Sequence, residues 1–304
     1  MKRISAILLF CIIFSTPSYS RDMRGLEDII KSILDSEIEG SIEEKEEETK
    51  KPLGEESSSQ YMTNRADNEK MEEKKEQISI PSLDRTLLET GLELFNAHNY
   101  DHALSKFKEL KMKYPQSPLM DSSTIWIAKI YIDTNKWDDA RDELLSISEN
   151  SGEYPTAVFQ MGEIEMKRGY PSAAIEFYYR VSSQFPNHHL ADDALLVLGN
   201  IYINEKKGNK ALQTLMRLIK YYRDRETIDD AYFYLGKLFE RDLMLRDFEI
   251  AIKLYKLFLK KSNEERALHF RYSPLKERVE GNLKQLEAIL MPHSSQASQQ
   301  YYRD

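Results

Sequence analysis

Apolar residues recur every three to four positions along residues 84–290, in stretches of helical length separated by short polar turns. Within this region a small residue is followed by an alanine five times, twelve residues later in four cases and fifteen in the last. The pairs are Gly91 and Ala103, Ala128 and Ala140, Gly162 and Ala174, Gly199 and Ala211, and Gly236 and Ala251. Small residues at both places let two antiparallel helices cross closely. The pattern predicts an all-α solenoid of about five helix-turn-helix repeats.

The expected repeats begin near residues 84, 121, 155, 192 and 229. In the fifth repeat the inter-helix turn is longer, around Asp242 to Arg246. A capping helix is expected over 274–290, where Leu275, Val279, Leu283, Leu286 and Leu290 recur at helical spacing. The first repeat carries the signature residues of the tetratricopeptide repeat (TPR), which the chain resembles: Leu87, Gly91, Leu94, Tyr100, Ala103, Phe107, Leu110 and Pro115. One departure is Glu165, where that family usually has an apolar residue.

The beginning of the chain reads as a secretory signal peptide over residues 1–20. Lys2 and Arg3 precede an apolar run, and Ser18 and Ser20 supply small residues before a cleavage site. This run is too short to cross a bilayer, and we expect no transmembrane segment in the mature chain. Cys11, the single cysteine, lies inside the signal. The alternative, in which Cys11 is lipidated, is disfavoured by the bulky residues before it.

The segment that follows divides into two parts. Residues 21–39 are expected to form an amphipathic helix with one apolar face, and residues 40–80 an acidic disordered linker, since they hold few apolar residues. The apolar face would self-associate, dock in the chain's own groove, or bind a partner. Its residues are Leu26, Ile29, Ile30, Ile33, Leu34 and Ile38. The TPR domain is then expected over 81–290 and a disordered tail over 291–304.

Charge and composition exclude several functions. The net charge is −8, and most of the acidic excess lies in residues 21–80, so nucleic acid is not an expected partner. No phosphate-binding glycine loop or hydrolase motif is present, and we expect no enzyme activity and no cofactor. His98 and His102 are four residues apart but flank a turn, so we expect no metal site there.

The resemblance implies a concave groove lined by the first helix of each repeat. Counted from the first residue of each repeat, positions 5 and 12 form an apolar stripe. Its residues are Leu88, Phe95, Ile125, Ile132, Phe159, Met166, Leu196, Ile203 and Phe233. This stripe is either part of the core or a surface for an apolar segment of a partner. Polar positions could fix the register of a bound segment: Lys129, Asn200, Asn204 and Lys237.

The joints between repeats suggest a cellular setting. Tyr114-Pro115 leading to Asp121, and Phe185-Pro186 leading to Asp192, resemble joints of bacterial envelope TPR proteins. The chain is similar to the Tol-associated cell division coordinator and to the outer-membrane assembly TPR lipoprotein. The resemblance implies an exported scaffold, free in the periplasm or associated with the outer membrane, that binds other envelope proteins through its groove. An alternative is a polysaccharide- or peptidoglycan-associated carrier, for which Trp126 is the one candidate platform.

Overall fold

The computed structural model describes residues 82–300, with side chains described up to residue 290. The predicted signal peptide, the helix of 21–39, the linker of 40–80 and the last four residues lie outside this range. Every regular element in the described range is a helix. No described helix combines the length and the apolar character needed to cross a membrane.

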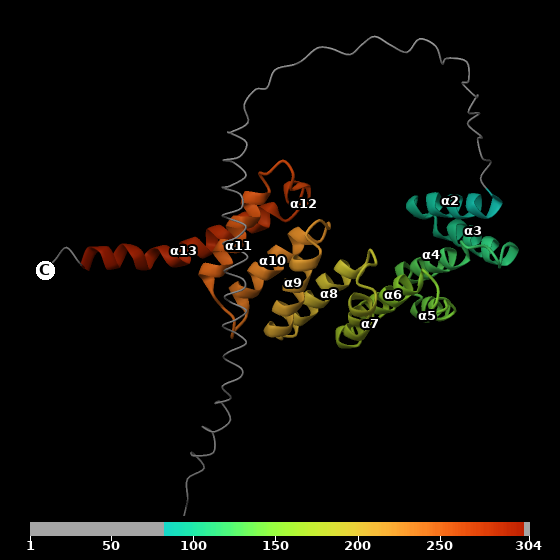
Figure 1. The fold of residues 1–304 in the computed structure, drawn as a ribbon, viewed down its shortest axis with the longest axis horizontal. Coiled ribbons are helices and arrows are strands. Elements are labelled where there is room, and N and C mark those ends of the chain that lie inside the picture. The colour runs from blue at the N-terminus through green and yellow to red at the C-terminus, as the bar shows by residue number, and fades with distance from the viewer. Residues whose placement is uncertain (1–81, 301–304) are drawn as a thin grey trace, which may run out of the picture. The chain divides into compact units, whose positions relative to one another are not determined.

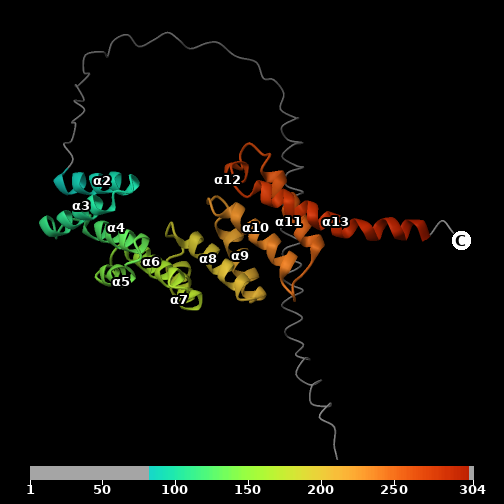
Figure 2. The same cartoon turned by 180° about the vertical axis from the view of Figure 1, so that it is seen from behind.

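Residues 82–300 contain five helix pairs, which follow one another along this part of the chain (Figures 1 and 2). The first helix of each pair is called helix A and the second helix B. The pairs are α2 (Leu83–Asn96) with α3 (Tyr100–Lys113), α4 (Met120–Asp133) with α5 (Trp137–Leu145), α6 (Tyr154–Lys167) with α7 (Pro171–Gln184), α8 (Ala191–Asn204) with α9 (Gly208–Tyr221), and α10 (Ile228–Arg241) with α11 (Phe248–Lys261). Each helix packs on its neighbours in the chain, and α4 also contacts α6, as α8 does α10. The predicted solenoid of five helix pairs is confirmed.

The small residues serve two different purposes at the crossing of helices A and B. The alanines of helix B are completely buried: Ala103, Ala140, Ala174, Ala211 and Ala251. The glycines of helix A, however, face a large side chain one turn further along helix B. A Cβ on Gly162 would lie 2.9 Å from the ring of Tyr178, and one on Gly199 would lie 2.7 Å from Leu215. Glycine is therefore required by a side chain that lies flat on helix A, and the predicted contact with the alanine is not the reason.

Three-residue turns join helices A and B in the first four repeats, and the middle residue of each turn is left-handed. His98, Asn135 and Lys206 have φ of 57°, 60° and 58°, and Gly169 has φ of 82°. A left-handed conformation is unfavourable for residues with a Cβ, by about 1–2 kcal/mol. In the fifth repeat the turn is longer, as predicted, and Asp247 caps α11 by accepting hydrogen bonds from the backbone N–H groups of Glu249 and Ile250.

Lys206→Gly is expected to raise the free energy of unfolding by up to about 1 kcal/mol, because glycine adopts the left-handed turn without a steric penalty. The neighbouring substitution Lys207→Gly is the control. Lys207 has φ of −95° and pairs with Glu205 at 2.6 Å, so glycine there adds freedom to the unfolded chain and also removes an ion pair. Thermal unfolding followed by circular dichroism should give a higher midpoint for Lys206→Gly and a lower one for Lys207→Gly. Equal shifts of both midpoints would contradict the account of the turn.

Hydroxyl groups in the joints between repeats bind the aspartate that opens the preceding helix A. Ser117 donates to Asp84 at 2.5 Å, Ser151 to Asp121 at 2.6 Å, and Thr227 to Asp192 at 2.9 Å. These bonds connect residues 30 to 35 positions apart. They give a physical reason for the Ser/Thr and Asp residues that recur around the joints.

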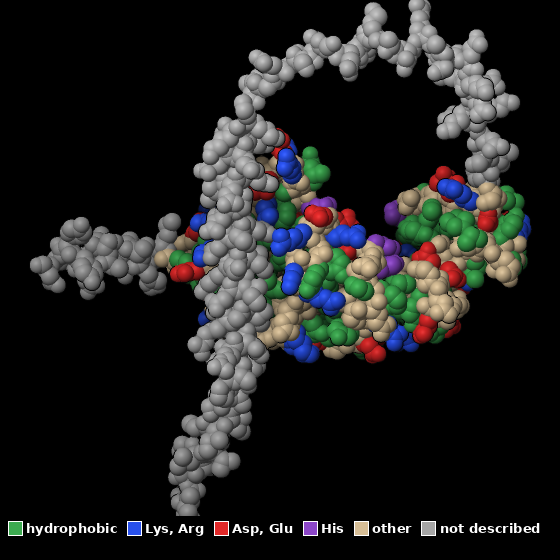
Figure 3. Space-filling view, viewed as in Figure 1, with side chains coloured by type: hydrophobic (Ala, Val, Ile, Leu, Met, Phe, Trp, Pro, Cys, Tyr) green, Lys and Arg blue, Asp and Glu red, His purple; other side chains and the backbone are tan. Residues whose placement is uncertain are grey.

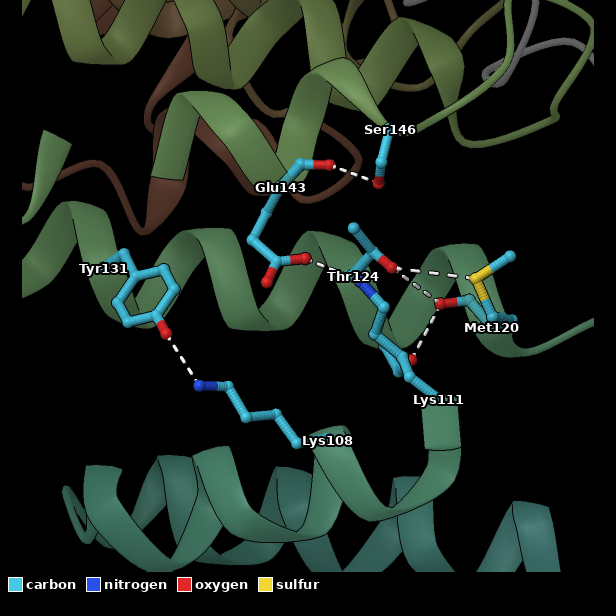
Figure 4. Close-up of polar contacts among 8 residues, drawn as sticks. Lys108, Lys111, Met120, Thr124, Tyr131, Glu143 and Ser146 are labelled. Carbon is cyan, nitrogen blue, oxygen red and sulfur yellow. Dashed lines mark hydrogen bonds and ion pairs between the residues drawn. The ribbon is translucent and has the colours of Figure 1, made fainter. Parts of the chain in front are cut away.

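Further polar contacts join the first repeat to the second (Figure 4). From α3, the Lys108 ammonium donates to the Tyr131 hydroxyl at 2.9 Å, and the Lys111 ammonium pairs with the Glu143 carboxylate at 2.6 Å. Tyr131 lies on α4 and Glu143 on α5, so one B helix is tied to both helices of the next repeat.

The C-terminal end of the array is closed by two further helices. The short helix α12 (Leu268–Arg271), which the sequence pattern did not predict, places the ring of Phe270 5.4 Å from Tyr232 and 5.3 Å from Phe258. The longer helix α13 (Lys276–Gln300) packs on α11 and buries Val279 and Leu286. It supplies the expected cap. The backbone of α13 stays helical over 291–300, part of the segment for which a disordered tail was predicted.

Candidate partner-binding face

The surface formed by the A helices, here called the A-helix face, contains the predicted groove residues. Three of them are buried, with exposures of 6% for Ile125, 0% for Ile132 and 2% for Phe233. These side chains belong to the core because the next A helix or α13 covers them: the Arg278 guanidinium lies 4.9 Å from the ring centre of Phe233. Their assignment to a ligand-contacting groove is therefore corrected.

The other apolar groove residues keep part of their surface. Leu88, Phe95, Phe159, Leu196 and Ile203 are half-buried, and Met166 is exposed. The ring of Phe95 packs 5.0 Å from Trp126, and that of Phe159 packs 5.1 Å from Tyr178. The stripe is thus divided between core and surface. On the face shown in Figure 3, apolar, acidic and basic side chains are interspersed over the repeats.

Polar groove residues form a paired arrangement in the middle of the array. The Lys129 ammonium on α4 lies 3.3 Å from the Glu163 carboxylate on α6 and 4.0 Å from Asp133. Lys129 and Glu163 occupy the same position in successive repeats, so their ion pair connects neighbouring A helices. Their charges neutralise one another, which leaves little net charge for a ligand.

The last two repeats differ because their polar groove residues are less fully paired. Asn204 donates to the Asn200 side chain at 3.3 Å, leaving amide groups for other bonds. Burial and then the charges of Arg241 and Arg278 lower the pKa of Lys237, against which Glu240 acts more weakly. The Lys237 ammonium also lies 5.9 Å from the ring centre of Tyr234. Arg241 is itself paired with Glu240 at 3.2 Å. An anionic group of a partner would be stabilised beside Lys237.

A second feature of this face was not foreseen from the sequence. A cavity of about 520 Å³ lies between the first turns of α8 and α10 and the segment around α12. Its acidic lining residues are Asp193, Glu226, Asp229 and Asp230, and its apolar ones include Leu196, Leu268, Tyr272 and Pro274. We call it the acidic cavity. The sequence signal is the triplet Asp-Asp-Ala, which occurs at 192–194 and again at 229–231.

Electrostatics in the acidic cavity are unfavourable for ionised carboxylates. The pKa of Asp193 is raised to about 6 by burial and by Asp192, Glu226 and Asp230, against which Arg225 acts more weakly. The pKa of Asp230 is also raised to about 6, by burial first and then by Asp229. Both groups are ionised at neutral pH, so the folded protein bears the cost of their charges.

Asp230→Asn is expected to stabilise the protein above pH 6 and to have little effect below pH 3.8. The second limit is the ordinary pKa of an aspartate carboxyl group. The folded-state pKa lies above the unfolded one. Folding therefore binds a proton between these pH values, and the stability of the wild-type protein falls as pH rises through this window. Thermal midpoints measured on both sides of the window test the prediction. A stabilisation that is the same at both pH values would refute it.

The two histidines considered for a metal pair have other partners. His98 Nδ1 lies 3.2 Å from the Tyr100 hydroxyl, and His102 Nδ1 lies 2.8 Å from Asn99 Oδ1. Trp126, the candidate sugar platform, is half-buried, with its ring against Phe95 and stacked 6.5 Å from Phe107. The structure thus places Trp126 within an aromatic cluster of the first two repeats.

Stacked helix pairs with a small residue at each crossing define the chain as a helical-repeat solenoid. Residues 193–224, which cover α8 and α9, match the family model of the tetratricopeptide repeat. Among solved structures, Pseudomonas aeruginosa PilF aligns with a TM-score of 0.50 at 13% identity, over 71% of this chain and 97% of that chain. MamA aligns with a TM-score of 0.47 at 20% identity, over 60% and 95%.

TTC0263, a thermophilic TPR protein from Thermus thermophilus, aligns with a TM-score of 0.41 at 18% identity, over 62% of this chain and 97% of that chain. No curated protein matches the sequence significantly. At these low sequence identities the likeness to the solved structures shows the fold alone. The fold is that of a tetratricopeptide-repeat solenoid, an architecture whose stacked repeats present an extended binding surface.

Proposed function

We propose that this protein is an exported periplasmic scaffold that binds a segment of another envelope protein on its A-helix face, in envelope assembly or cell division. The tetratricopeptide fold supports a role in protein interaction. The observation that carries the proposal is the unequal pairing along the A-helix face. Lys129 and Glu163 neutralise each other. Lys237 makes no ion pair within residues 82–290, and the exposed Asn204 keeps a second amide N–H after its bond to Asn200.

The export part of the proposal rests on the sequence of residues 1–20, and the envelope setting rests on the resemblance of the joints. N-terminal sequencing of the chain purified from its native cell would test export. A start near Arg21 supports it, and a chain that retains Met1 in the cytosolic fraction argues against it. The alternative of a glycan carrier gains nothing from Trp126, because its ring packs against two other aromatic rings.

Partner binding can be tested by crosslinking the tagged full chain in native cell envelopes and identifying what copurifies. The informative variant combines Met166→Ser and Lys237→Ala on the A-helix face. Its matched control combines Met112→Ser on α3 and Lys253→Ala on α11, two exposed residues of B helices. We expect the first variant to lose a partner that the control retains. Loss in both variants, or in neither, would contradict recognition by the A-helix face.

A further inference from the structure

Asp229 is an exception among the aspartates that open the A helices. Asp84, Asp121 and Asp192 each accept a hydrogen bond from a Ser or Thr hydroxyl of the following joint. Asp229 lines the acidic cavity and is only 4% exposed, yet its carboxylate has no hydrogen-bond or ion-pair partner among residues 82–290. Ser273, the corresponding joint residue, accepts a hydrogen bond from the backbone N–H of Leu275 at 3.1 Å. Ser117 and Ser151 accept the same kind of bond, but only these two also donate to the aspartate of the preceding helix A.

Several carboxylates crowd the acidic cavity, and burial and mutual repulsion make their charges costly, as the raised pKa values of Asp193 and Asp230 show. Burial of an uncompensated charge is among the least favourable arrangements in a folded protein. Asp193, Glu226 and Asp230 line the same cavity, and His269 lies at it as well. The charge of Arg225 lowers the pKa of Asp193, but burial and the surrounding carboxylates raise it by more, so the pKa of Asp193 is raised overall. A cationic ligand would therefore be bound strongly here.

The shape of the cavity selects the kind of cation. No three acidic or histidine side chains in the described residues are placed to hold one metal ion. The cavity, at about 520 Å³, is also far larger than a single ion needs, and Leu196 and Tyr272 add apolar walls. A long side chain with an aliphatic stem and a charged end suits such a site. Guanidinium is preferred to ammonium because it is weakly hydrated and presents several donors to separate carboxylates.

We propose that the acidic cavity binds an arginine side chain of the partner segment. The inference rests on the proposed function, because the cavity belongs to the same face: Leu196 is both a predicted groove residue and part of the cavity wall. Asp193 and Asp230 stand at position 2 of successive repeats, one turn before the groove positions. A bound arginine would thus anchor the segment near the starts of α8 and α10, while Lys237 favours an acidic residue further along α10.

The test uses the full chain and a fluorescently labelled peptide, Ala-Arg-Ala-Arg-Ala, with a second peptide in which citrulline replaces arginine. Citrulline keeps the shape and loses the charge. We expect the arginine peptide to bind at least about tenfold more tightly, because a hydrogen bond to a charged group contributes about 1.5–3 kcal/mol. Equal binding of the two peptides, or no binding of the arginine peptide, would overturn the proposal. This comparison needs no variant.

A matched pair of variants locates the site. The first combines Asp229→Asn and Asp230→Asn, and the control combines Asp138→Asn and Asp139→Asn, which stand in the same Asp-Asp-Ala context at the start of α5 and are exposed. Both variants change the net charge equally. We expect about a tenfold or greater loss of arginine-peptide affinity in the first variant only. An equal loss in both would show non-specific attraction and overturn the proposal.

The outcome is separable from that of the crosslinking experiment. If Met166→Ser with Lys237→Ala abolishes partner capture while the arginine and citrulline peptides bind alike, the assignment of the cavity fails and the proposed function stands. If the arginine peptide binds more tightly than the citrulline peptide, but neither the A-helix variant nor the B-helix control loses a partner, the cavity binds cations and the proposed function fails.

Discussion

Gly236→Ala is expected to destabilise the protein by about 1–2 kcal/mol, although alanine is the better helix former. A Cβ at this position would lie 2.5 Å from the ring of Tyr255, which is completely buried. The ring cannot move aside easily, since its hydroxyl donates to Glu240 at 2.9 Å and accepts from Asn282 at 3.2 Å. Overpacking costs about 1–3 kcal/mol, and the gain in helix propensity returns at most about 1 kcal/mol.

Gly281→Ala is the matched control, because it lies in a helix and a Cβ there meets no atom within 4 Å. It is expected to stabilise the protein by up to about 1 kcal/mol. Urea denaturation followed by circular dichroism measures both effects. If Gly236→Ala and Gly281→Ala shift the midpoint in the same direction, the ring of Tyr255 does not constrain helix A as described.

Arg141→Met is expected to destabilise the protein by about 1–2 kcal/mol by leaving Glu165 without its main partner. Glu165 is 9% exposed, and its carboxylate lies 2.5 Å from the Arg141 guanidinium and 3.5 Å from that of Arg168. Breaking a fully buried pair costs about 3–5 kcal/mol. The smaller value applies here because Arg141 is partly exposed and Arg168 remains. Methionine keeps the aliphatic packing of the arginine stem.

Two further variants separate charge from packing in this prediction. The double substitution Arg141→Met with Glu165→Met should recover most of the lost stability, since an apolar pair replaces an ion pair without an orphaned charge. Lys113→Met, which breaks the exposed pair with Glu109, should change the free energy of unfolding far less than Arg141→Met does, because solvent screens an exposed pair. A double variant no more stable than Arg141→Met would contradict the ion-pair explanation, and thermal unfolding would reveal it.

The helix pairs could be predicted because the small residues and apolar positions repeat at a fixed interval, which only a stacked array satisfies. The reason for the glycines could not be predicted, because it depends on which side chain of helix B lies over helix A. Gly162 meets Tyr178, sixteen residues later, and not Ala174. The left-handed turn residue Lys206 also gave no sequence signal, since lysine does not favour that conformation.

The candidate site was only partly predictable from repeat positions. Position in the repeat places Leu196 and Ile203 on the A-helix face, but it does not say how far the next helix covers a side chain, and Ile132 and Phe233 proved to be buried. The acidic cavity depends on α12, a short helix that the pattern did not indicate. The repeated Asp-Asp-Ala triplet was a usable signal for it. The third copy, at Asp138, opens a B helix and is exposed, so the triplet alone does not define a cavity.

The central claim is that the A-helix face, and not the B-helix surface, contacts a partner protein. Site-specific incorporation of a photo-crosslinking amino acid tests it most directly, at Met166 on α6 and separately at Met112 on α3, two exposed methionines. Irradiation of native cells should give a discrete crosslinked product from the Met166 position and none from the Met112 position. A product from Met112 alone, or none from either position, would contradict the claim.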